Sequence, residues 1–115
     1  LISQKNASPV TFVSTQVFNG AAPTSSTSLD LSATVGAQSR MVMLEESANP
    51  AVYALFVPGN ITANITGTPH SAGRLGHAGS SGGNTYALVK THTDGTVNWI
   101  ADSGGTMTIK VVAYW

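Results

Sequence analysis

The sequence contains no cysteine, and charged residues occupy only 9% of its 115 positions. The lack of cysteine excludes disulfides, thiolate metal ligands and cysteine nucleophiles. Five basic residues balance five acidic ones, so the formal net charge is zero. These few, scattered cations cannot supply the phosphate contacts of a nucleic-acid-binding protein or the basic patch of a membrane-surface protein. No apolar run approaches the roughly 20 residues that span a bilayer. We therefore expect no nucleic-acid partner and no membrane insertion.

The polarity of the chain comes from small neutral residues, because Ser, Thr, Asn and Gly account for 46 of the 115 residues. The hydrophobic share of 42% is too large for a disordered chain and permits one modest core. We therefore expect a single domain over residues 1–115. A nearly uncharged surface offers little electrostatic repulsion between copies, which favours a subunit that associates with itself.

Short segments of alternating apolar and polar residues run along most of the chain, as in antiparallel strands. Between residues 86 and 91, for example, Tyr86 and Leu88 fall on one face while Ala87 and Val89 fall on the other. No segment shows helical periodicity. About eight such strands in one small domain predict an all-β, antiparallel, jelly-roll-like sandwich.

Turn residues separate the predicted strands. Asp94-Gly95 is a strong hairpin signal and predicts that residues 86–91 pair with residues 97–100. A second hairpin is predicted between residues 40–46 and 51–57, which are separated by a short polar stretch that ends in Asn-Pro.

Residues 67–83 differ from the rest of the chain because they hold six Gly and almost nothing apolar. This composition predicts a long exposed loop, and long loops in compact domains usually serve a function. We expect a binding loop in which His70, Arg74 and His77 are the polar contact residues.

No pattern typical of catalysis fits its context. Residues 79–83 match G-x-S-x-G, but a nucleophile elbow needs a strand before it and a helix after it, and neither is predicted here. Glycoside hydrolysis needs two carboxylates that face each other, whereas the adjacent Glu45 and Glu46 point to opposite faces of a predicted strand. We expect no catalytic residue, no cofactor and no enzymatic activity.

The three histidines His70, His77 and His92, with Asp94, are the candidate ligands of a metal site, and simple solvent exposure is the other interpretation. Two of these histidines fall in the Gly-rich segment, which does not preorganise ligands as zinc sites do. We favour solvated histidines and expect no metal. The alternative is a metal site formed by one His from each of three copies that meet on a symmetry axis.

Exposed aromatic residues would suit a carbohydrate-binding module, because such modules stack Tyr and Trp against sugar faces. Tyr86, Trp99 and Trp115 are the candidates for that alternative function. We favour core or subunit-interface positions for the aromatic residues near the C-terminus, and we place Trp99, Tyr114 and Trp115 at an oligomer interface or aromatic contact.

Several stretches resemble small β modules of tailed-bacteriophage virions. They are Val17-Phe18-Asn19-Gly20, Leu29-Asp30-Leu31-Ser32, Val35-Gly36, Arg40-Met41-Val42-Met43-Leu44, Val97-Asn98-Trp99 and Val111-Val112-Ala113-Tyr114-Trp115. The resemblance covers most of the chain apart from the Gly-rich segment. It implies a non-enzymatic homotrimer of the tail-fibre, receptor-binding or capsid-decoration kind, located in the virion. The partners it implies are other virion proteins or a host-surface receptor or glycan.

Overall fold

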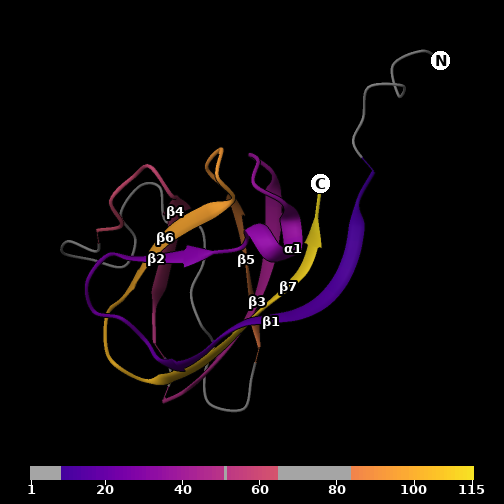
Figure 1. The fold of residues 1–115 in the computed structure, drawn as a ribbon. Coiled ribbons are helices and arrows are strands. Elements are labelled where there is room, and N and C mark those ends of the chain that lie inside the picture. Colours follow the sequence, from indigo (N-terminus) through magenta and orange to yellow (C-terminus); the bar gives the residue numbers. More distant parts are fainter. Residues whose placement is uncertain (1–8, 51, 65–83) are drawn as a thin grey trace.

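The computed structural model describes residues 9–50, 52–64 and 84–115, which form two packed antiparallel sheets (Figure 1). Its elements are β1 (Thr11–Ala21), β2 (Thr27–Asp30), α1 (Ser32–Val35), β3 (Met41–Asn49), β4 (Ala54–Pro58), β5 (Thr85–Lys90), β6 (Thr96–Ala101) and β7 (Thr106–Tyr114). One sheet has the order β1-β7-β3-β5 and the other the order β2-β6-β4. The predicted all-β, jelly-roll-like sandwich is confirmed.

Each strand lies in the sheet opposite to that of the strand before it in the chain. This alternation is how a jelly roll winds its chain between two sheets. The described residues contain seven strands. Residues 65–83, between β4 and β5, lie outside the described part. Within the described ranges, no helix has the length and apolar character needed to cross a membrane.

Both predicted hairpins are wrong, although the strands that they were meant to join exist. The turn at Asp94-Gly95 carries the chain from β5 in one sheet to β6 in the other. Residues 50–53 likewise lead from β3 in the larger sheet to β4 in the smaller one. Turn residues set how tightly the chain reverses, but burial of two inner sheet faces decides which strands pair.

An aromatic group fills the core between the sheets. Trp99 on β6 has no exposed surface and lies parallel to the ring of Phe56 on β4, with ring centroids 5.4 Å apart. Phe18 on β1 meets Trp99 edge-on from the other sheet, with centroids 5.0 Å apart. The Phe18–Trp99 contact crosses the sandwich and packs the two sheets together, whereas the Phe56–Trp99 pair lies within the smaller sheet.

A tight turn supports the end of the sandwich that carries α1. Gly95 has φ of +83° and its N–H donates to the carbonyl of His92 over 2.8 Å. One carboxylate oxygen of Asp94 accepts hydrogen bonds from the hydroxyl and the backbone N–H of Thr96, at 2.7 and 3.1 Å. The Gly95 carbonyl accepts from the N–H of Leu31 just before α1 over 3.0 Å. The turn therefore joins the two sheets at this end.

Candidate functional site: the outer face of the four-stranded sheet

The four-stranded sheet presents one face to the core and the other to solvent. On β3, the buried side chains of Val42 and Leu44 alternate with the outward side chains of Met41, Met43 and Glu45. The same alternation on β5 and β7 continues the outer face across the sheet, and a register shift opposite Met43 and Leu44 places Ala113 of β7 beside Met43. The strand register then sets which outward side chains are neighbours.

One half of this outer face is mainly apolar, and its charged member is the exposed Lys90, which pairs with Met41 at the edge of the sheet. Phe12 is 81% exposed and Leu88 is 40% exposed, from strands at opposite edges of the sheet. Met43 lies between them, because it pairs with Leu88 on one side and with Ala113 on the other, and Ala113 pairs with Phe12. Large exposed apolar side chains that are contiguous mark contact surfaces more often than isolated ones do.

Trp115 extends this apolar half. Its N–H donates to the carbonyl of Met41 and its carbonyl accepts from the N–H of Met41, each over 3.0 Å. Residues that exchange both hydrogen bonds have their side chains on the same face of the sheet, so the half-buried Trp115 lies beside Met41. We define the apolar half as Phe12, Met41, Met43, Leu88 and Trp115.

The other half of the outer face is polar and hollowed. A depression of about 250 Å³, here called the polar hollow, is lined by Gln16, Glu45, Ser47, Asn84, Thr108 and Lys110. An adjoining depression of about 340 Å³ shares Ser47, Asn84 and Thr108 with it. The two depressions thus form one trough over β3 and β7.

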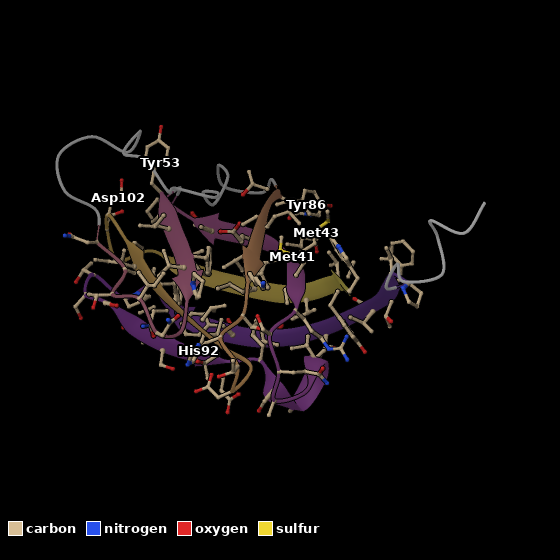
Figure 2. All side chains as sticks on the ribbon, turned by 90° about the horizontal axis from the view of Figure 1, so that it is seen from above. Met41, Met43, Tyr53, Tyr86, His92 and Asp102 are labelled. Atoms are coloured by element: carbon tan, nitrogen blue, oxygen red, sulfur yellow. The ribbon has the colours of Figure 1, made fainter. Side chains whose placement is uncertain are left out.

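Tyr86 stands where the two halves meet. It is 55% exposed, and its hydroxyl donates a hydrogen bond of 2.9 Å to Oε2 of Glu45, its partner across the strand pair. This bond and the negative charge of Glu45 raise the pKa of the Tyr86 phenol, so the hydroxyl stays protonated and continues to donate. Figure 2 shows Tyr86 on the same side of the sheet as Met41 and Met43, and well away from Tyr53, Asp102 and His92.

The aromatic residues predicted to make contacts fall in three different environments. Trp99 is a core residue, and this corrects its assignment to an interface or a sugar contact, because a side chain with no exposed surface reaches neither. Tyr114 is half-buried, packs against the core, and has the Arg40 guanidinium 5.5 Å above its ring centre. Trp115 lies on the outer face. Tyr86, Trp99 and Tyr114 therefore do not share a face.

The predicted binding loop residues His70, Arg74 and His77 lie outside the described residues. His92 precedes the tight turn, where its backbone N–H donates to the carbonyl of Thr96 over 2.9 Å. The hydrogen bonds from Thr96 lower the pKa of Asp94, whose carboxylate is thereby engaged in the turn. In the part of the chain that the structure describes, no three His, Asp or Glu side chains are grouped to hold a metal ion.

The predicted opposite orientation of Glu45 and Glu46 is found, with a consequence that the sequence pattern did not reveal. Glu46 has no exposed surface, and both of its carboxylate oxygens lack a hydrogen-bond partner within the described ranges. Burial raises its pKa to about 8, because the interior disfavours the charged form. At neutral pH Glu46 is therefore a protonated core residue and not a surface acid.

The polar hollow was not predicted, because five of its residues come from three strands that are distant in sequence, β1, β3 and β7, and the sixth, Asn84, directly precedes β5. Their outward direction follows from strand alternation, but their meeting depends on the order β1-β7-β3-β5. No protein family, curated protein or solved structure matches the chain.

Proposed function

We propose that the protein is a non-enzymatic structural or attachment subunit of a virion, of the tail-fibre, receptor-binding or capsid-decoration kind, that works as a homo-oligomer. The observation that carries the proposal is the apolar half of the outer face, headed by Phe12 with 81% of its surface exposed. The proposal is supported further by the low share of charged residues and by the resemblance of several stretches to β modules of phage virions.

The apolar half suits contact with a second copy of the chain. It has residues on β1, β3 and β5 and at the end of β7, and it brings together one Phe, two Met, one Leu and one Trp. Aromatic residues and Met are enriched at protein interfaces, where their large side chains lose the most water-exposed apolar surface. Net charge near zero adds little repulsion between copies.

Solution mass tests the oligomer. Light scattering after size exclusion should give a multiple of the 11.8 kDa chain, with three copies expected for the homotrimer. Replacing both Phe12 and Leu88 by Ser should shift the mass toward one copy, because each change puts a hydroxyl into the proposed contact.

Ile61→Ser is the matched control, since Ile61 is 47% exposed but lies after β4, away from the outer face. It should leave the mass unchanged. A wild-type protein that remains a single copy at high concentration would refute the oligomer. An equal decrease of the solution mass in Ile61→Ser and in the double variant would also refute it. The virion assignment is tested separately, by asking whether antibodies against the protein label purified particles in electron micrographs.

The alternative function, a monomeric carbohydrate-binding module, retains one favourable observation. Of its three candidate aromatic residues, Trp99 is buried and Trp115 belongs to the apolar half, whereas Tyr86 is exposed beside the polar hollow. Binding of a glycan and self-association use different parts of the outer face and are compatible in one protein.

A further inference from the structure

We propose that the polar hollow, with Tyr86 at its edge, binds an uncharged saccharide. The inference deepens the attachment role proposed above by naming the class of receptor chemistry, and it rests on that role for its biological meaning. The binding itself is a property of this face and is testable without the role.

The groups that line the polar hollow match a ligand rich in hydroxyls. Glu45 only accepts hydrogen bonds and Lys110 only donates them, whereas the amides of Gln16 and Asn84 do both. A sugar hydroxyl also donates and accepts, so each of these groups finds a partner on the same kind of ligand. The hydroxyls of Ser47 and Thr108 add two further groups of dual character.

The charges of the hollow disfavour an ionic ligand. Glu45 on β3 and Lys110 on β7 are directly opposite each other in the strand register, so both signs meet at one place. An anion such as phosphate approaching Lys110 is repelled by Glu45, and a cation approaching Glu45 is repelled by Lys110. An uncharged polar ligand avoids both penalties.

Tyr86 provides the apolar surface that sugar binding also needs. Its ring is more than half exposed, and its hydroxyl is tied to Glu45 over 2.9 Å, so the ring and the carboxylate hold each other in place. The C–H face of a pyranose ring is apolar and packs on an aromatic side chain, while its hydroxyls point to polar groups at the rim. Positioning groups on strands makes such a site more rigid than one on a loop.

The size of the trough indicates a short length of sugar chain. The polar hollow, at about 250 Å³, is smaller than the pockets of about 300–1,000 Å³ that enclose drug-sized ligands. It is therefore suited to a single sugar unit. The adjoining depression, which shares Ser47, Asn84 and Thr108, gives room for the next unit along β3 and β7. A shallow site of this kind binds weakly, and several copies in one assembly multiply its effect.

The test is a titration of the isotope-labelled protein followed by backbone amide NMR signals. The probes are the methyl glycosides of glucose, galactose, mannose and N-acetylglucosamine and their common disaccharides, with sodium phosphate as the anionic probe. We expect saturable shifts at Gln16, Glu45, Asn84 and Lys110 with at least one sugar, and none with phosphate. Binding of phosphate in place of sugars would overturn the proposal, as would the absence of saturable shifts with every sugar.

Variants distinguish the hollow from the rest of the surface. Asn84→Ala should weaken the sugar affinity about tenfold, the usual cost of losing one or two hydrogen bonds to a ligand. Asn60→Ala is its matched control, because Asn60 is an exposed amide outside the hollow, and it should bind as the wild type does. Equal affinities of the two variants would refute the site.

The titration is repeated in the Phe12→Ser, Leu88→Ser variant. These residues do not line the hollow. If the oligomer proposal fails, the sugar shifts are still expected in this background. If the sugar proposal fails, the solution mass is unaffected. The two proposals can therefore fail independently.

Discussion

Glu45 and Glu46 are neighbours in the chain, yet Glu45 lies on the outer face, where the Tyr86 hydroxyl donates to it, and Glu46 is enclosed in the core. The pleat of β3 is the cause, because successive side chains of a strand point to opposite faces of its sheet. Glu46 occupies the same series of inward positions as Val42, Leu44 and Ala48. The core thus contains one carboxyl group at a position where the pattern calls for an apolar residue.

Glu46 should make the protein less stable as the pH rises from about 4.5 toward 8. Over this interval the carboxyl is ionised in the unfolded chain but protonated in the folded one, whose pKa is about 8. Folding therefore takes up a proton, and the free energy of unfolding falls by up to about 1.4 kcal/mol per pH unit. Above pH 8 the carboxyl is ionised in both states and its contribution levels off.

Glu46→Gln should remove this part of the pH dependence, since the amide does not titrate. The measurement is urea unfolding of the variant and the wild type at pH 5, 7 and 9. The difference between their free energies of unfolding at each pH reports Glu46, because the titration of the other groups cancels. Glu45→Gln is the control and should keep the wild-type slope between pH 5 and pH 7. A Glu46→Gln protein with the wild-type slope would contradict the assignment.

Gly95 should not tolerate a side chain. Its φ of +83° disfavours L residues, and a Cβ would lie 2.5 Å from the Gly36 carbonyl oxygen and 2.9 Å from Cβ of Ser32. We expect Gly95→Ala to lower the free energy of unfolding by at least about 1–3 kcal/mol, measured by urea unfolding. In Gly104→Ala, whose nearest neighbour would be 4.0 Å away, the change should stay within about 0.5 kcal/mol. Similar losses in both variants would show that the strain at Gly95 has been misjudged.

Substitutions at the two tryptophans should have different effects, on stability at Trp99 and on association at Trp115. Trp99→Ala should cost about 3–5 kcal/mol, because it removes the ring that packs on Phe56 and Phe18. Trp99→Phe should cost less, since it keeps an aromatic ring and removes an indole N–H that finds no acceptor among the described residues. Trp115→Ala should change the unfolding free energy of the chain less than Trp99→Ala does and lower the solution mass instead.

Fluorescence gives an independent check of these two positions. The emission of the Trp115→Phe variant comes from Trp99 alone and should lie at short wavelength, as expected for an indole without exposed surface. The emission of Trp99→Phe comes from Trp115, which is partly exposed, and should lie at longer wavelength. The reverse order would contradict the burial of Trp99.

The sequence predicted which residues face inward much better than which strands lie together. In β5 the predicted faces are found, with Ala87 and Val89 buried and Tyr86 and Leu88 exposed. Alternation is a local property, so one strand is enough to show it. Pairing is not local: Asp94-Gly95 has the chemistry of a hairpin turn, yet it joins strands of different sheets.

The candidate site shows the same difference between local features, which the sequence predicts, and non-local ones, which it does not. No sequence pattern groups Gln16, Glu45, Asn84 and Lys110, because only the sheet order makes them neighbours. Trp115 could be predicted as a contact residue from its bulk, and its place beside Met41 supports that role without testing it. Trp99 was misassigned because Trp near the end of a β protein fits both a core and an interface, and only the stacking on Phe56 distinguishes them.

The position of β7 has a consequence for the order of events during folding. β7 follows the other described strands in the chain, yet it lies inside the larger sheet between β1 and β3. Until β7 docks, β1 has no neighbour in that sheet. The larger sheet therefore closes through pairing of strands that are far apart in the chain, and such non-local pairing slows folding.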